Sequence, residues 1–388
     1  MVTSRPEQIR ILYPLYDLNS GALTNWLMGV LRRLDRQRFQ VDFLVHNLEP
    51  GYFDDEARAM GARIFPCPHP SRLWTYLPNF KRILQKYGPY DVVHSSLGNC
   101  AFHMLLARKV KVPLRISHIH ADFIRWAKGS SSKTNPLKIL FYQSISPYWI
   151  CKHSTLILTI TKEAAKATLG KKFSSVKNWD ILPCGIELDS FSNTIEKINV
   201  RRELGIPESA FVIGHVGRFS RQKNQIFVVK IAAELNRFEP NIRVLLIGDG
   251  PLRAETEAAV MQAGLSDKVI FTGLRTDVPQ LMLAAMDVFV FPVLFEDLGM
   301  VIIEAQAAGL PCIISDAIVE EAVIVKPLVY RLSLNDSAST WAKAIFRVRG
   351  MKSDSTKTEA LITLNKSHFN IDNNVAELQN IYSLCCRC

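Results

Sequence analysis

The sequence predicts an α/β fold with two Rossmann-like domains, each built on a doubly wound parallel sheet. Short β-branched segments alternate with helical segments along the whole chain, and this alternation is typical of parallel sheets. The alternation pauses at the polar stretch 187–208 and then restarts. The length of 388 residues exceeds one ordinary core and suits two domains.

The first domain is predicted to cover residues 1–190. Its strands should carry the β-branched and apolar runs, and helices such as Ala22–Leu34 and Ala101–Lys109 should lie between them. The predicted strands are Ile9–Leu15, Val41–Val45, Ala62–Phe65, Asp91–His94, Leu114–His118 and Thr155–Thr161.

The second domain is predicted to cover residues 191–365, and residues 366–388 should form a C-terminal helix that returns toward the first domain. Val288–Phe291 is an unbroken apolar run, as expected of a parallel strand buried on both faces. Ligands of such sheets bind at the carboxyl ends of the strands, so we expect the domains to face a common cleft. The predicted strands are Phe211–Val216, Arg243–Ile247, Val269–Phe271, Val288–Phe291 and Cys312–Ser315.

Composition indicates a soluble globular protein, with 48% apolar and 21% charged residues. No apolar run reaches the roughly 18 residues of a membrane span, and the N-terminus lacks a signal-peptide pattern. We therefore expect a cytoplasmic protein without disulfides. Three of its eight cysteines, Cys385, Cys386 and Cys388, cluster in the tail without zinc-site spacing, and a loose tail is the favoured interpretation.

The positive charge is concentrated in the first half of the chain. Residues 1–195 hold 26 Lys and Arg against 14 Asp and Glu, whereas residues 196–388 hold 21 against 22. No nucleic-acid-binding motif is present. An anionic membrane surface, a phosphate-bearing acceptor or a generally basic composition would each explain the excess. The apolar stretch Pro136–Ile150 is a candidate for membrane contact, although a buried helix is the favoured interpretation.

Two glutamates follow the predicted strand Val288–Phe291. Glu296 lies in the loop, and a helix should run from about Gly299 to Ala308 with Glu304 in its first two turns. Carboxylates accept hydrogen bonds from the vicinal hydroxyls of sugars and riboses, and a helix N-terminus favours phosphate. The alternative is that Glu304 caps the helix and Glu296 is a solvated loop residue.

Two cations follow the predicted strand Phe211–Val216. Arg218 and Lys223 lie in the loop that leads to the next helix. An Arg fork and a Lys point charge together suit a diphosphate. The alternative is a pair of surface charges.

These residues resemble the motifs of the retaining GT-B glycosyltransferases of family 4, in particular the bacterial members that build exopolysaccharide and capsule. The resemblance extends from Ile9 to about Tyr382. The matching elements are Glu-x7-Glu at Glu296 and Glu304, Gly-Arg-x4-Lys-Asn at Gly217, Arg218, Lys223 and Asn224, and the segments Gly248–Leu252 and Pro183–Ile186.

The resemblance implies roles for the second-domain residues. Arg218 and Lys223 would hold the donor diphosphate and stabilise the departing negative charge. Glu304 would bind the donor ribose and Glu296 the transferred sugar. The remaining donor-binding residues would be Gly217, Arg275 near the nucleotide base, and Gly299, Met300 and Val301 through their backbone.

In the first domain, the resemblance places Ser20 and Gly21 near the donor phosphates, after the first strand. A histidine at the end of the Leu114–His118 strand would contact the reacting sugar. His120 is the first choice for this catalytic role, and His118 is the second choice, assigned to donor binding.

Three positions depart from the family pattern. Ser20 replaces a glycine, Asp297 stands where many members have glycine, and Cys184 stands where many have asparagine. Asp297 directly follows Glu296 and is the departure that we expect to affect the choice of donor sugar.

The resemblance implies transfer of a hexose-type sugar from a nucleotide-sugar donor, with UDP favoured over GDP, to a glycan or lipid-linked saccharide in polysaccharide biosynthesis. The sequence contains no Asp-x-Asp metal clamp, and Arg218 and Lys223 can supply its charge. We therefore predict metal-independent activity without a cofactor. The resemblance and the basic first domain also predict peripheral contact of that domain with the inner face of the cell membrane. The two domains are expected to close over the donor.

Three alternatives remain. A nucleotide-sugar epimerase shares the architecture but lacks this set of motifs in this order. A dinucleotide oxidoreductase is disfavoured, because no Gly-x-Gly-x-x-Gly follows the first strand. A non-catalytic partner subunit of a transferase is disfavoured by the intact Arg218, Lys223, Glu296 and Glu304.

Overall fold

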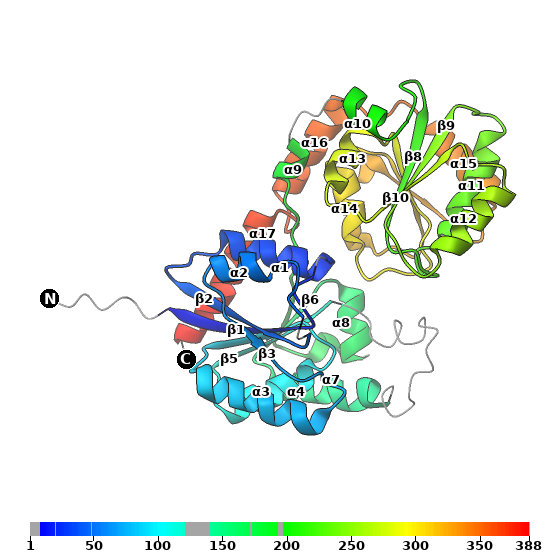
Figure 1. Ribbon diagram of the computed structural model, residues 1–388. Coiled ribbons are helices and arrows are strands. Elements are labelled where there is room, and N and C mark those ends of the chain that lie inside the picture. Colours follow the sequence, from blue (N-terminus) through cyan, green and yellow to red (C-terminus); the bar gives the residue numbers. More distant parts are fainter. Residues whose placement is uncertain are drawn as a thin grey trace. The chain divides into compact units, whose positions relative to one another are not determined.

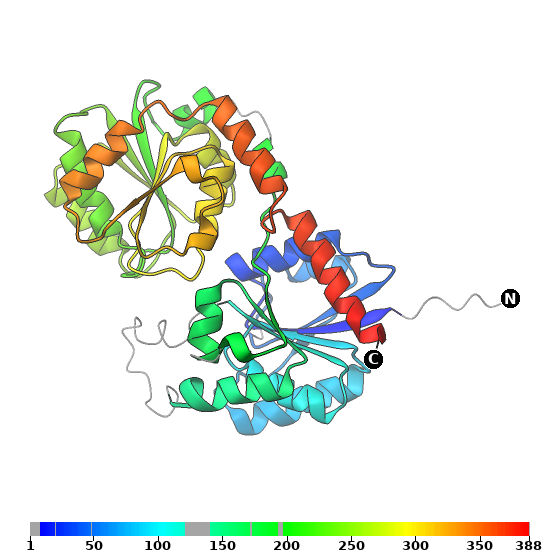
Figure 2. The ribbon, with the colours of Figure 1, turned by 180° about the vertical axis from the view of Figure 1, so that it is seen from behind.

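The computed structural model describes residues 8–19, 21–47, 49–120, 140–170, 173–192 and 197–387. The chain divides into two units, each with its own sheet (Figures 1 and 2). Unit 1 comprises Met1–Ile186 and Ile371–Cys388, and unit 2 comprises Glu187–Asn370. From the sequence, the first domain was predicted to end at residue 190 and the second at residue 365. A common cleft between the two domains stays a prediction.

The sheet of unit 1 is parallel throughout, with strand order β3-β2-β1-β4-β5-β6-β7. The order reverses between β1 and β4, so this is the topological switch point, where ligands of doubly wound sheets bind. The strands are β1 (Ile9–Leu15), β2 (Phe39–Val45), β3 (Ile64–Pro66), β4 (Val92–Ser95), β5 (Leu114–Ile119), β6 (Leu156–Thr159) and β7 (Trp179–Ile181).

Helices cover both faces of this sheet. Figures 1 and 2 show α1 and α17 on one face and α3, α4 and α7 on the other. The helical elements are α1 (Ala22–Arg33), α2 (Asp54–Ala59), α3 (Leu73–Tyr87), α4 (Cys100–Lys109), the π-helix η1 (Phe141–Ile145), α7 (Ser146–His153), α8 (Lys162–Leu169), η2 (Phe173–Ser175), α17 (Ile371–Tyr382) and η5 (Ser383–Arg387).

The sheet of unit 2 is also parallel throughout, with strand order β10-β9-β8-β11-β12-β13 and the switch point between β8 and β11. Its strands are β8 (Phe211–Val216), β9 (Ile242–Ile247), β10 (Val269–Gly273), β11 (Val288–Phe291), β12 (Cys312–Ser315) and β13 (Val329–Leu332). Its helical elements are α9 (Asp189–Ser192), α10 (Lys197–Glu203), α11 (Gln225–Asn236), α12 (Arg253–Gln262), α13 (Val278–Ala284), α14 (Met300–Ala307), η3 (Glu320–Ala322), η4 (Lys326–Leu328), α15 (Ala338–Arg347) and α16 (Asp354–Asn365).

The predicted α/β class with two doubly wound sheets is confirmed. Every predicted strand is present, with bounds that differ by at most two residues, and all four residues of β11 are buried. Two strands were missed, β7 and β13. Both are short and partly exposed at the edge of their sheets, so they lack the apolar run that marks a buried parallel strand.

The C-terminal helix α17 belongs to unit 1 and holds the segment where the chain leaves that unit. The Ile371 N–H donates to the Ile186 carbonyl at 3.1 Å, and the Asn374 side chain donates to the Pro183 carbonyl at 2.8 Å. Gly185 is needed here because a Cβ would lie 2.8 Å from the Ile371 Cα. The Trp26 indole of α1 donates to Asn374 Oδ1 at 2.7 Å, so α1 and α17 are joined as well.

A lysine of unit 2 donates hydrogen bonds to backbone carbonyl groups at the C-terminal end of α13. The Lys352 ammonium donates to the carbonyl oxygens of Met282, Leu283 and Met286 at 2.9, 2.6 and 2.7 Å. Replacing Lys352 with Met should lower the free energy of unfolding by about 2–3 kcal/mol, because three carbonyls lose their donor. The midpoint of denaturant unfolding measures this effect, and the exposed Lys343→Met is the control. Equal midpoints for the two variants would contradict this role.

Candidate functional site

The predicted site of unit 2 lies at the switch point of its sheet. Arg218 and Lys223 follow β8, whereas Glu296 and Gly299 follow β11, and β8 and β11 are neighbours in the sheet. The carboxyl ends of both parallel strands lie at the same edge, so the two loops meet there. The fold thus brings together residues that are about 80 positions apart in the chain.

Lys223 and Glu296 form an ion pair. The Lys223 ammonium donates to the Glu296 carboxylate and lies 4.9 Å from the centre of the Phe291 ring. Gln222 Nε2 donates to the same carboxylate at 3.4 Å and to the Phe295 carbonyl at 3.0 Å. Both charged side chains are mostly buried, 17% and 16% exposed. A ligand that binds at these two side chains must therefore either hydrogen-bond to the intact ion pair or break the contact between Lys223 and Glu296.

Arg218 is exposed and differs from Lys223 in having no ion pair or side-chain hydrogen bond with any residue that the structure describes. Its backbone is held in place, because Gln225 Nε2 donates to its carbonyl at 3.0 Å. The guanidinium fork is consequently available to an anionic ligand at no cost in broken protein contacts.

Glycines bring the loops after β8 and β9 into backbone contact. A Cβ on Gly248 would lie 2.3 Å from the Gly217 carbonyl oxygen, and a Cβ on Gly250 would lie 2.5 Å from the Phe219 carbonyl oxygen. Only glycine permits this approach. The predicted donor-binding Gly217, which directly precedes Arg218, therefore lies where the backbones of the two loops touch.

The helix α14 begins directly after Gly299. This glycine has φ +82°, and a Cβ here would meet Ile302 Cδ1 at 2.9 Å and Glu296 Cγ at 3.2 Å, so no other residue fits without strain. Helix geometry leaves the N–H groups of Met300 and Val301 without partners inside the helix. These groups and the helix dipole make the start of α14, beside Glu296, suitable for a negative group.

Glu304 lies on the second turn of α14 and is partly exposed, although protein surrounds most of its carboxyl group. Burial raises its pKa to about 7. Within the described part of the chain, no side-chain or backbone donor bonds to this carboxyl group. A carboxyl group placed in this way has unused acceptor capacity for the hydroxyls of a ligand.

Arg275, predicted near the nucleotide base, is engaged by protein carboxylates. Its guanidinium makes a two-pronged contact with Asp277, at 2.7 and 2.6 Å, and lies 3.4 Å from Glu203. The Asp277 hydrogen bond raises the pKa of Arg275. The guanidinium thus fixes the loop after β10, and the backbone of that loop is the part that remains for a base.

In unit 1, His118 lies inside a chain of neutral imidazoles. His118 Nε2 must donate to the Leu182 carbonyl, 2.8 Å away, because a carbonyl only accepts. His118 Nδ1 then accepts from His94 Nε2 at 3.1 Å, and His94 Nδ1 accepts from the Tyr382 hydroxyl at 2.8 Å. Burial lowers the pKa of His118 to about 4. Both ring nitrogens of His118 are therefore committed to protein contacts.

His120 follows β5 and is freer than His118. Its Nδ1 lies 3.5 Å from Cys184 Sγ, and its buried Nε2 has no hydrogen-bond partner among the described residues. Its ring packs on His118 and Trp26, and burial lowers its pKa well below the usual value. His120 thus holds a neutral imidazole with one ring nitrogen whose hydrogen-bonding capacity is unused by the described residues.

Gly21 is the residue immediately before α1, with an extended backbone, and a Cβ at this position would meet no atom of the described residues within 4 Å. Protein packing therefore does not require a glycine here, whereas close approach of a ligand to the helix start would. The neighbouring Ser20 lies outside the described residues.

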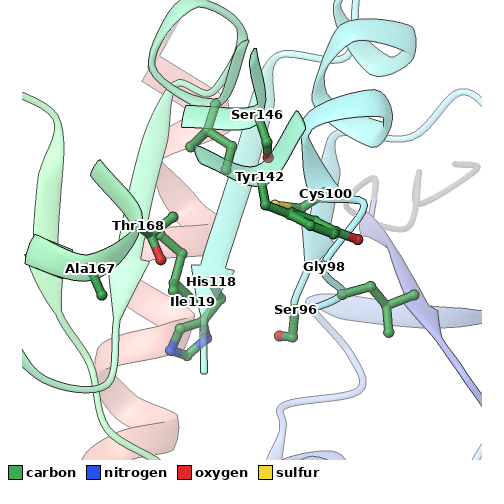
Figure 3. Close-up of a pocket in the computed structure, with 11 residues that line it drawn as sticks. Ser96, Gly98, Cys100, His118, Ile119, Tyr142, Ser146, Ala167 and Thr168 are labelled. Carbon is green, nitrogen blue, oxygen red and sulfur yellow. The ribbon is translucent and has the colours of Figure 1, made fainter. Parts of the chain in front are cut away.

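A pocket lies at the carboxyl ends of β4 and β5, beside the switch point of unit 1 (Figure 3). Its enclosed volume is small, about 20 Å³, and the wider hollow of about 410 Å³ includes open solvent. Ser96, Gly98 and His118 come from the strand ends, and Tyr142, Ser146 and Ile150 come from η1 and α7. Its lining thus combines apolar surface with several hydroxyl groups.

Sequence reasoning missed the residues that support the site. Gln222 and Phe291 position the Lys223–Glu296 pair, and Trp26, His94 and Tyr382 pack around the histidines. Gln222 adjoins the motif at Lys223, and His94 ends a predicted strand, so both had a local signal. Trp26 and Tyr382 lie far away in sequence and had none.

Two Rossmann-like units of seven and six parallel strands define the GT-B fold. Solved structures share it across nearly the whole chain. HepE of Anabaena, crystallised with UDP and glucose, aligns with a TM-score of 0.76 at 18% identity, covering 97% of this chain and 100% of HepE. Sucrose-phosphate synthase of Thermosynechococcus elongatus aligns with a TM-score of 0.77 at 20% identity, covering 98% and 100%.

Two family models and several sequence relatives match the chain. The family model "Glycosyltransferase Family 4" matches residues 24–190, and "Glycosyl transferases group 1" matches residues 196–355. EpsF of Bacillus subtilis, named as a glycosyltransferase, is 32% identical over 382 residues, which is 97% of each chain. The UDP-Gal:alpha-D-GlcNAc-diphosphoundecaprenol alpha-1,3-galactosyltransferase of Escherichia coli is 25% identical over 90% of each chain. The chain belongs to the glycosyltransferases, and it is a transferase enzyme.

Among the described residues, no helix combines the length and the apolar character that crossing a bilayer requires. All six cysteines whose side chains are described are free thiols.

Proposed function

We propose that this glycosyltransferase is a retaining member of family 4, which transfers a hexose from a UDP-sugar to a lipid-linked saccharide at the cytoplasmic face of the membrane. The observation that carries the donor part is the set of charges at the switch point of unit 2, where Arg218 has no ion pair with the described residues and Lys223 adjoins Glu296. The E. coli relative is named for a UDP-sugar donor and a diphosphoundecaprenol-linked acceptor, and this chemistry supports our choice of both substrates.

The proposed mechanism assigns the donor diphosphate to Arg218, Lys223 and the start of α14. The bond between the anomeric carbon and the diphosphate breaks, and the acceptor oxygen bonds to the same face of the sugar. The acceptor proton passes to the departing diphosphate. Arg218 and Lys223 stabilise the charge that develops on the leaving group, Glu296 binds the transferred sugar, and Glu304 binds the ribose. His120, as a neutral imidazole, contacts a hydroxyl of the reacting sugar.

A panel of nucleotide sugars, measured by the shift of the thermal unfolding midpoint, tests the choice of donor. A ligand stabilises the folded state by an amount that grows with its concentration relative to its Kd. We expect stabilisation by one or more UDP-hexoses at concentrations where the GDP-sugars have little effect. Stabilisation by GDP-sugars alone would overturn the assignment to UDP, and stabilisation by none would overturn donor binding.

Transfer is expected to continue after chelation of divalent metals, because Arg218 and Lys223 supply the positive charge that a metal–carboxylate clamp would otherwise provide. Turnover of a UDP-sugar in excess EDTA measures this. Activity that disappears with EDTA and returns with Mg²⁺ or Mn²⁺ would show that the two side chains are insufficient.

A further inference from the structure

Gln222 connects the two loops that form the candidate site of unit 2. Its side-chain Nε2 donates to the Phe295 carbonyl at 3.0 Å, and its backbone carbonyl accepts from the Leu294 N–H at 2.9 Å. The same Nε2 donates to Glu296 Oε2 at 3.4 Å. The Gln222 amide therefore reaches the carboxylate from a position that two further hydrogen bonds hold in place.

The two oxygens of the Glu296 carboxylate are used unequally. Lys223 and Gln222 both donate to Oε2. The other oxygen, Oε1, accepts no hydrogen bond from the described residues and is not buried. Glu296 Cγ lies beside Gly299, where a Cβ would come within 3.2 Å of it, so the side chain has little room to turn on that side. Oε1 is thus the oxygen that remains for a ligand hydroxyl.

The Lys223 ammonium has two partners in the proposed function. It donates to Glu296 in the ligand-free protein, whereas transfer requires it at the donor diphosphate. Its flexible stem lies along Gly217, where a Cβ would meet Lys223 Cγ and Cδ at 3.3 Å. A diphosphate carries more negative charge than one carboxylate, so donor binding should draw the ammonium away from Glu296. The mostly buried carboxylate then loses its charged donor.

We propose that Gln222 is a positioning residue, which keeps Glu296 oriented for the transferred hexose after Lys223 has moved to the donor diphosphate. Its amide continues to donate to Oε2, so Oε1 stays available for a sugar hydroxyl. Lys223 and Gln222 thus exchange the main donor role on one oxygen when the donor binds. This inference rests on the proposed function, because it takes the diphosphate and the hexose as the ligands of these residues.

Affinities for UDP and for a UDP-hexose separate this role from a purely structural one. Calorimetric titration uses UDP and the UDP-hexose that stabilises the wild type most. In Gln222→Met, affinity for the UDP-hexose should fall about tenfold and affinity for UDP by less than about twofold, because only the sugar contacts Glu296. A side chain that merely tethers the two loops would change both affinities by the same factor.

The matched control is Asn224→Gly in the same loop. Asn224 Nδ2 donates to the Pro292 carbonyl at 2.9 Å, so it also joins the loops after β8 and β11, but without a hydrogen bond to Glu296. Its backbone is left-handed, with φ +57°, which glycine adopts without strain. The ratio of the two affinities should stay at the wild-type value in this variant. Circular dichroism and thermal unfolding confirm that each variant is folded.

A second measurement requires no ligand. Gln222→Met should lower the midpoint of denaturant unfolding more in a Lys223→Met background than in the wild type, because Gln222 is then the remaining donor to Oε2 among the described residues. The Lys223→Met variant imitates the departure of the ammonium from Glu296.

The possible outcomes distinguish this inference from the proposed function. Equal losses of UDP and UDP-hexose affinity in Gln222→Met, unchanged affinities, or equal stability effects of Gln222→Met in both backgrounds would each overturn the role of Gln222 while leaving donor binding intact. A wild type that binds no UDP-hexose would overturn the proposed function itself.

Discussion

Replacing Arg218 with Met is expected to lower kcat by about 10²–10³-fold, because one preorganised positive donor at the leaving group is lost. Folding should be unaffected, since the Arg218 side chain is exposed and makes no ion pair with the described residues. Turnover of the UDP-sugar under saturating conditions measures the effect.

The control for this variant is Arg221→Met. Arg221 is exposed in the same loop and carries the same charge, but the proposed mechanism gives it no contact. Equal losses of kcat in the two variants would show that only the general charge of the loop matters. An unchanged kcat in Arg218→Met would remove Arg218 from the mechanism.

Lys223 allows catalysis to be separated from stability. Lys223→Met leaves the mostly buried Glu296 carboxylate without its ion-pair partner, so both activity and stability should fall. Adding Glu296→Gln removes the uncompensated charge, and the double variant should regain stability without regaining activity. Recovery of activity in the double variant would mean that Lys223 serves only to neutralise Glu296.

The second large effect is expected at Glu304. Glu304→Gln should weaken UDP-sugar binding by about 10–100-fold, because a charged acceptor of the ribose hydroxyls is replaced by a neutral one. The wild-type affinity should also depend on pH. The raised pKa of about 7 means that Glu304 is protonated below this value, so affinity should fall as pH decreases through 7.

Calorimetric titration with the UDP-sugar from pH 6 to 8 measures this dependence, since the diphosphate diester takes up no proton in that range. The Gln variant should show a flat profile. A flat wild-type profile, or the same slope in both proteins, would contradict the role of Glu304.

The pH dependence that Glu304 gives to the free energy of unfolding should be opposite to the one it gives to donor affinity. Its pKa is higher in the folded protein than the usual 4.5, so the folded state binds more protons than the unfolded state between these two values. The contribution to stability is therefore fully present below about 4.5 and is lost as pH rises through about 7. Without ligand, Glu304→Gln should be more stable than the wild type at pH 8.

The fold could be predicted from the sequence because buried parallel strands leave a signal in nearly every segment. The run Val288–Phe291 is apolar at each position, and the structure buries each of its side chains. The edge strands Trp179–Ile181 and Val329–Leu332 have no such signal, because half-exposed strands need no apolar run.

The residue types of the site were predictable, but their pairing was not. Glu296 and Lys223 each stood in a motif after a strand, yet only the adjacency of β8 and β11 makes them an ion pair. The raised pKa of Glu304 follows from the protein that surrounds α14, which no local pattern encodes. The commitment of both His118 nitrogens likewise depends on Leu182 and His94, which come from other segments.

The central claim is that the charged switch point of unit 2 holds a UDP-hexose for transfer with retention. Proton NMR of the reaction with the α-linked UDP-hexose and membrane-borne acceptor tests it most directly. We predict an α-linked glycosidic product and an equimolar amount of UDP, both absent with Arg218→Met on the same time scale. A β-linked product would contradict retention, and a donor isomerised without acceptor would identify an epimerase instead.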